Sequence, residues 1–145
     1  MTGLSALFIA HVVFTTVGYV GLIAINLIVL VLCARQDAAL MVEAISVWRR
    51  AARVFGPILG VGVLFGLWLV GATHVGFAAF WLLVTYGLII VALGAQAAIM
   101  VPWQFRAHRA SAEGGKVSGR PIMLVLSVFA VAYVSIISLM ILKPG

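Results

Sequence analysis

The sequence predicts an all-α polytopic membrane protein, a single-domain bundle of four transmembrane helices within 145 residues. The chain is 66% hydrophobic and only 8% charged, whereas soluble domains hold roughly 25% charged residues. A soluble fold could not cover this much apolar surface. A helix needs roughly 20 apolar residues to cross the hydrocarbon core, and four uncharged stretches meet this need. They lie at about residues 4–33, 54–73, 77–101 and 122–142.

The placement of charge predicts the topology. Every charged residue except Lys143 lies between Arg35 and Arg53 or between Arg106 and Arg120. Basic residues crowded into the loops between spans mark the cytoplasmic side. Loops 34–53 and 102–121 are therefore predicted to be cytoplasmic, with both termini on the outer side of the membrane. The net charge of +6 then reflects topology, and no nucleic-acid partner is expected.

The first span carries a polar stripe headed by His11. At about 100° per residue, Thr15, Asn26 and Tyr19 fall within about 80° of His11 on one side of the helix. An ionisable side chain at membrane depth is costly, so it normally points into a bundle and finds a partner there. His11 is therefore either a cofactor ligand or a packing residue hydrogen-bonded to a neighbour, and both alternatives stay open.

The stretch between the first two spans has helical periodicity of its own. Asp37 can cap a helix, and one face of that helix gathers apolar side chains. These are Leu40, Met41, Ala44, Val47, Trp48 and Ala51. Two pictures stay open. The segment is either an amphipathic helix in the headgroup zone with Trp48 as its interfacial anchor, or an extension of both spans as a helical hairpin beyond the membrane.

Arginines near the inner surface are predicted to contact anionic lipid. The alternative is that some of them pair with acidic groups of a partner subunit or with a carboxylate-bearing cofactor. They are Arg49, Arg50, Arg53, Arg106 and Arg109.

Spans two and three are predicted to form an antiparallel hairpin, because only His74, Val75 and Gly76 separate them. Small residues spaced by four or seven positions let helix backbones approach closely. Such spacing predicts helix packing at six glycines of these spans. They are Gly56, Gly60, Gly62, Gly66, Gly87 and Gly94.

Prolines bound the last two spans. Pro102 is expected to close span three, and Pro121 is expected in the first turn of span four. The glycine-rich connection over residues 107–119 is expected to be a flexible loop. Asn26 and Gln96, in the inner halves of spans one and three, could bond across helices. Such bonds contribute about 0.6 kcal/mol on average, enough for helix register.

The histidines are the best candidates for chemistry, and topology separates them. His11 and His74 belong to the outer side and could approach each other, whereas His108 lies on the cytoplasmic side. Imidazole is the usual axial ligand of haem iron, and helix bundles bind such cofactors between facing helices. Haem b or another tetrapyrrole is thus a candidate cofactor, with His11 as ligand, His74 as a second ligand, and Thr15 and Tyr19 beside it.

Several other classes of function are disfavoured. No predicted span contains Asp, Glu, Lys or Arg, which argues against an independent ion-coupled carrier. Cys33 is the only cysteine, so it forms neither an intrachain disulfide nor a cysteine-based metal site. No zinc spacing, P-loop or dinucleotide fingerprint is present in the sequence.

Three short segments carry a family resemblance. They are His11-Val-Val-Phe followed by Gly18-Tyr-Val-Gly21, Arg53-Val-Phe-Gly-Pro-Ile-Leu running into Val63-Leu-Phe-Gly-Leu-Trp-Leu, and Trp81 with Pro102 and Arg106 around span three. Together they resemble the HemJ and CopD-like four-span bacterial membrane proteins. Resemblance to the HemJ branch implies that haem b binds at the span-one histidine, and that a lysine in a later span is also needed for porphyrinogen oxidation. This chain has no lysine in any predicted span, so only His11 carries over.

Two functions from different classes follow. The first is an accessory or assembly subunit without catalysis of its own, packing by its glycine faces into a larger membrane complex or a homo-oligomer. The alternative is a membrane protein that binds haem b or another tetrapyrrole through His11, with a redox or cofactor-handling role. Any enzymatic activity would be that of a membrane oxidoreductase.

Overall fold

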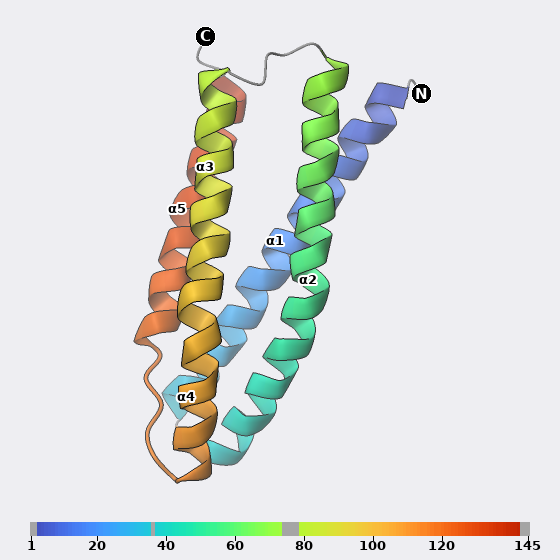
Figure 1. The fold of residues 1–145 in the computed structure, drawn as a ribbon. Helices are drawn as coiled ribbons and strands as arrows, with labels where there is room; N and C mark the ends of the chain where they lie inside the picture. The colour runs from blue at the N-terminus through green and yellow to red at the C-terminus, as the bar shows by residue number, and fades with distance from the viewer. Residues whose placement is uncertain (1–2, 36, 74–78, 143–145) are drawn as a thin grey trace.

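The structure is a computed structural model, and it describes residues 3–35, 37–73 and 79–142. These residues form a bundle of four long helices (Figure 1). The elements in chain order are α1 (Gly3–Arg35), α2 (Ala38–Ala72), α3 (Phe80–Ala95), the π-helical turn η1 (Gln96–Met100), α4 (Val101–Ala112) and α5 (Arg120–Leu142). Because α3, η1 and α4 follow one another without a break, they make one helix. The predicted all-α four-helix bundle is confirmed.

All four helices are long and apolar enough to cross a membrane. The shortest, α5, has 23 residues, and at about 1.5 Å per residue it exceeds the roughly 30 Å of a hydrocarbon core. Large apolar side chains such as Leu64, Trp68 and Ile90 are exposed on the outside of the bundle, as expected of surfaces in contact with lipid. The chain is therefore a multi-pass membrane protein.

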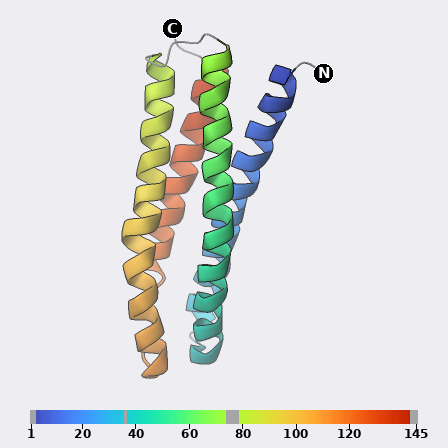
Figure 2. The same cartoon turned by 45° about the vertical axis from the view of Figure 1, so that its right-hand side comes forward.

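The charged residues gather at one end of the bundle. The start of α1, the end of α2, the start of α3 and the end of α5 lie together at the other end (Figures 1 and 2). The α1–α2 connection and the α4–α5 connection lie at the charged end, as predicted. All charged residues that the structure describes lie in these connections or in the parts of the helices that lead to them, and the furthest along α2 is Arg53.

The stretch after span one belongs to α2, so the extended hairpin is the picture observed. Asp37 caps the helix as predicted, with Oδ1 accepting a hydrogen bond of 3.0 Å from the Leu40 N–H. The buried face is rotated from the predicted one, because Leu40 and Val47 are exposed whereas Ile45 is buried. Trp48 is only 5% exposed, so the prediction that it anchors the helix in the headgroup zone is wrong.

The α1–α2 contact depends on glycines. A Cβ added at Gly62 would lie 2.6 Å from the Thr15 backbone N, and one at Gly66 would lie 2.7 Å from His11 Cε1. These two glycines therefore pack as predicted. Gly18 of α1 makes an equally close approach, since a Cβ there would lie 2.6 Å from the Leu59 backbone N, and the glycine spacing did not predict this contact.

The other predicted glycines do not pack within this chain. A Cβ at Gly56, Gly60, Gly87 or Gly94 would meet nothing within 4 Å among the described residues. At these four positions the described part of the chain therefore supplies no packing partner. The reason is geometric, because these glycines lie on sides of α2 and α3 that face away from the close helix contacts.

The third helix continues through Pro102, so the predictions that Pro102 ends this helix and that residues 102–121 are all loop are wrong. Pro102 lies in the first turn of α4, and the helix runs on to Ala112. A proline ring collides with the carbonyl group four residues earlier and donates no hydrogen bond. The turn before it, η1, is π-helical, and this wider turn accommodates the ring.

The remaining α4–α5 connection is short. Gly114 adopts a φ of 71°, and the Gly115 N–H donates to the Ala110 carbonyl at 2.7 Å. This left-handed glycine ends the helix, because a residue with a side chain would be strained there. Residues 107–112 are therefore helical rather than a flexible loop, whereas Pro121 lies in the first turn of α5 as expected.

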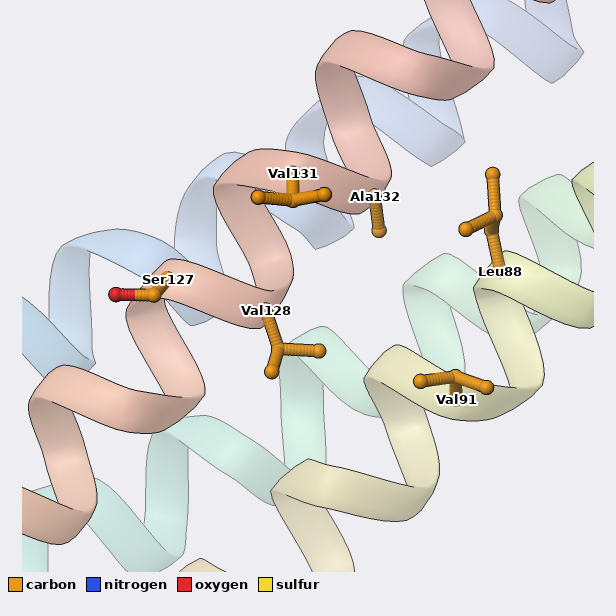
Figure 3. Close-up of a pocket in the computed structure, with 6 residues that line it drawn as sticks. All are labelled: Leu88, Val91, Ser127, Val128, Val131 and Ala132. Atoms are coloured by element: carbon orange, nitrogen blue, oxygen red, sulfur yellow. The ribbon is translucent and has the colours of Figure 1, made fainter.

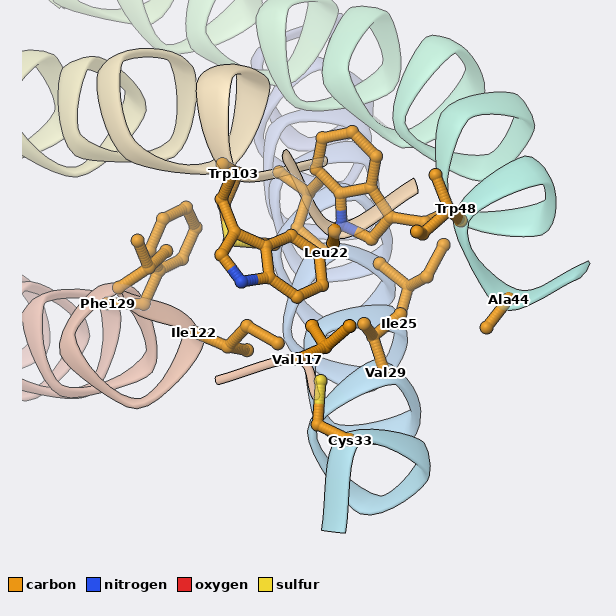
Figure 4. Packing of buried hydrophobic residues seen from close by; sticks show 14 of the residues in the cluster. Leu22, Ile25, Val29, Cys33, Ala44, Trp48, Trp103, Val117, Ile122 and Phe129 are labelled. Atoms are coloured by element: carbon orange, nitrogen blue, oxygen red, sulfur yellow. The ribbon is translucent and has the colours of Figure 1, made fainter. Parts of the chain in front are cut away.

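The hydrophobic core lies mainly in the half of the bundle next to the charged end, and all four helices contribute to it (Figure 4). Trp48 of α2 and Trp103 of α4 point into the space between the helices. Met100, Ile122 and Phe129 are completely buried there.

The glycine contact between α1 and α2 can be tested with a matched pair of substitutions. Gly62→Ala forces the two backbones apart and is expected to lower the free energy of unfolding by about 1–3 kcal/mol. Gly60→Ala, on the open side of the same helix, should be neutral or stabilising, because alanine favours a helix by about 1 kcal/mol over glycine. Unfolding in mixed detergent–SDS micelles, followed by circular dichroism, measures both. Equal effects would contradict this packing.

Candidate functional site

The polar stripe on α1 faces the interior of the bundle. Tyr19 and Asn26 are buried, and His11 and Thr15 are half-buried. The side chains of His11, Tyr19 and Asn26 each bond to another helix, so the stripe connects α1 to α2, to α5 and to η1.

His11 makes the outermost of these connections. Its Nδ1 lies 2.8 Å from the Gly62 carbonyl oxygen on α2. Because a carbonyl oxygen only accepts, Nδ1 carries the hydrogen and donates it. The ring lies against Gly66, where no side chain competes for the space. Of the two sequence alternatives for His11, the packing hydrogen bond is therefore present.

Thr15 and Tyr19, predicted to lie beside a cofactor, have other partners. The Thr15 hydroxyl donates to the His11 carbonyl of its own helix at 2.6 Å. The Tyr19 hydroxyl donates to the Phe129 carbonyl on α5. Its ring stacks on Tyr133, with 4.8 Å between ring centroids, so Tyr19 fastens α1 to α5. His74 lies outside the described residues.

Asn26 is the junction of the buried network. The Trp48 indole Nε1 donates to Asn26 Oδ1 at 2.9 Å, and Asn26 Nδ2 donates to Gln96 Oε1 at 3.0 Å. An indole nitrogen only donates, so Trp48 determines the orientation of both amides. The prediction that Asn26 and Gln96 bond across helices is confirmed, whereas their pairing with each other and with Trp48 was not predicted.

The network ends on a donor without an acceptor. Gln96 is buried, and its Nε2 has no hydrogen-bond partner among the described residues. Gln96 is also the first residue of the π-helical turn η1, and such turns occur frequently at functional sites. The junction consists of amide and indole groups. These groups can fix the register of the helices or donate a hydrogen bond to a bound molecule, but they supply no acid, base or nucleophile.

The arginines predicted to contact lipid or a partner lie at the charged end. Arg49 Nε donates to Gln104 Oε1 on α4 at 2.9 Å, and an Arg50 amino group donates to the Ser46 hydroxyl at 3.3 Å. Arg53, Arg106 and Arg109 are exposed. No ion pair joins charged side chains anywhere in the described ranges, so no acidic side chain there neutralises these arginines.

Two other places offer little chemistry. An apolar hollow of about 320 Å³ lies between α3 and α5 (Figure 3). Its single polar lining residue, Ser127, donates back to the Met123 carbonyl of its own helix at 3.0 Å. Within the described part of the chain, no group of three or more His, Cys, Asp or Glu side chains could hold a metal ion.

Comparison with known proteins adds no family to this picture. No family model, curated protein or solved structure matches the chain. The resemblance to the HemJ and CopD-like proteins stays a prediction based on the segments quoted above.

The Asn26 junction gives a prediction about stability. Asn26→Leu leaves the Trp48 indole N–H and the Gln96 side chain unpaired in an apolar core, which should cost about 1–3 kcal/mol of unfolding free energy. Adding Gln96→Leu should cost less than the sum of the two single changes, because the residues share one network. Thr16→Val, at an exposed position of α1, is the control. A loss in Asn26→Leu no larger than in this control would contradict the assignment.

Proposed function

We propose that this protein is an accessory or assembly subunit of a larger membrane complex or homo-oligomer, without catalysis of its own. One observation supports this most directly. The polar side chains of the α1 stripe are used in hydrogen bonds to neighbouring helices or to the backbone of α1. They therefore stabilise the packing of the bundle, and they do not converge on a place where a substrate could react.

The outer face of α3 is the proposed contact surface. Gly87 and Gly94 are two turns apart on one face of this helix, and a Cβ at either position would meet nothing within 4 Å in the described part of the chain. The neighbouring Leu83 and Ile90 are exposed. Small residues between large apolar ones let another helix approach closely, which matters in lipid because no hydrophobic effect drives helices together.

A second candidate function is binding of haem b or another tetrapyrrole, and the geometry of His11 favours it. Histidines that bind metals usually donate their other ring N–H to a backbone carbonyl or carboxylate, which orients the ring. His11 donates to the Gly62 carbonyl in this way, so its Nε2 could hold the haem iron. Haem would supply electron-transfer chemistry when bound, and His74 would be the candidate for a second axial ligand.

One purification experiment separates the two functions. In mild detergent, the protein is expected to elute with a second polypeptide or as a homo-oligomer, and to be colourless. The double substitution Gly87→Leu/Gly94→Leu should release the partner without loss of helix. Ala130→Leu, at an exposed position of α5, should retain it. A Soret band that disappears in His11→Ala but persists in Thr15→Val would support the haem alternative and overturn the first proposal.

The orientation proposed for the bundle places its charged end in the cytoplasm of a bacterial cell and both termini outside the inner membrane. Support comes from the collection of arginines at the end opposite the start of α1 and the end of α5.

Reporter fusions measure this orientation. A periplasmic reporter such as a phosphatase fused after Gly145 should be active, whereas the same reporter inserted after Lys116 should be inactive. The reverse pattern would overturn the orientation.

A further inference from the structure

Arg49 differs from the other arginines of the charged end in how it is held. It is half-buried, and its Nε donates to Gln104 Oε1 at 2.9 Å. Its guanidinium carbon lies 5.3 Å from the centre of the Phe105 ring, a cation–π distance. Two neighbouring residues of α4 therefore orient this side chain, whereas Arg53, Arg106 and Arg109 are exposed.

The contacts of Arg49 leave its terminal amino groups free for a ligand. The hydrogen bond to Gln104 uses only Nε of Arg49. Neither Nη atom has a hydrogen-bond or ion-pair partner in the described ranges. A guanidinium is a planar fork of donors that matches two oxygens of a phosphate or carboxylate. A fork that the protein already orients loses less rotational freedom on binding than a mobile one.

The position of Arg49 along α2 indicates what kind of anion it meets. The uncharged apolar part of α2 begins at Val54, five residues further on, which corresponds to about 7.5 Å of helix. On α4, Gln104 lies three residues beyond Val101, or about 4.5 Å. The headgroup layer of one leaflet is about 5–8 Å thick. Both partners therefore lie at the level of lipid phosphates.

The surrounding charge favours the same ligand. The described residues include only three acidic side chains, of which Asp37 caps α2 and Glu43 and Glu113 are exposed. With no ion pair between side chains of the described ranges, none of these acidic residues neutralises Arg49, which leaves its charge available to an anionic ligand. Arg53, one turn further along α2, adds positive charge on the same side of the helix.

We propose that Arg49, oriented by Gln104 and Phe105, is a binding site for the phosphate group of an anionic phospholipid. This site does not depend on the proposed subunit role or on haem binding. An acidic side chain of a partner protein would use the same fork. We favour the lipid over a partner protein because the site lies at the depth of the lipid headgroups, so lipid phosphates are its immediate neighbours.

The test compares two arginines of the same helix. Purified protein is titrated with phosphatidylglycerol in detergent, and bound lipid is counted by native mass spectrometry. Arg49→Lys keeps the charge but loses the fork, and it should weaken phosphatidylglycerol binding by about tenfold. Arg50→Lys, whose arginine bonds only to the exposed-side Ser46 hydroxyl, is the matched control and should bind as the wild type does.

Two further measurements separate the alternatives. Gln104→Leu leaves the Arg49 charge intact but releases the guanidinium, so it should weaken binding too, and phosphatidylcholine should bind poorly to every variant. Equal lipid binding by Arg49→Lys and Arg50→Lys would overturn the proposal. So would displacement of the lipid by inorganic phosphate at equal concentration, or loss of a co-purified polypeptide in Arg49→Lys with lipid binding unchanged.

Discussion

The hydrogen-bonded junction at Asn26 is the interaction on which the rest of the bundle depends. In lipid, apolar side chains gain little by leaving one apolar surface for another, so polar bonds and close packing must select the arrangement of the helices. Asn26 is completely buried and bonds to Trp48 on α2 and to Gln96 in η1. Any rotation of these helices would leave an indole or an amide unpaired in apolar surroundings, which is costly.

Around this junction, the helices are held in two different ways. Toward the outer end, Gly18 and Gly62 bring α1 and α2 into backbone contact. This close approach puts the Gly62 carbonyl within reach of the His11 side chain, which donates to it. Toward the charged end, large side chains such as Trp103 and Phe129 fill the space between all helices. Polar groups inside the bundle thus hold its helices together, while the sites proposed for other molecules are the outer face of α3 and the side chain of Arg49.

Features that follow from apolar length, charge and helical period were predicted well. They include the four spans, the shared side of the basic stretches, the Asp37 cap, and the bonding of Asn26 and Gln96 across helices. Predictions about which neighbour a residue meets were less successful. Trp48 is a residue type that often anchors helices at the membrane interface, yet the buried face of α2 is rotated so that Trp48 bonds to Asn26. Gly60 and Gly62 look equivalent in sequence, yet only Gly62 faces α1.

The sequence by itself determined the class of the molecule, because an uncharged run of some 20 apolar residues has only one low-energy arrangement in a bilayer, a helix across it. It also determined that the polar stripe headed by His11 points inward, since water is absent outside. Only the tertiary structure decided the partner of each polar group and the continuation of the third helix through Pro102. Those outcomes depend on the rotation of each helix about its own axis and on the π-helical turn at Gln96, and both are set by contacts between segments far apart in the chain.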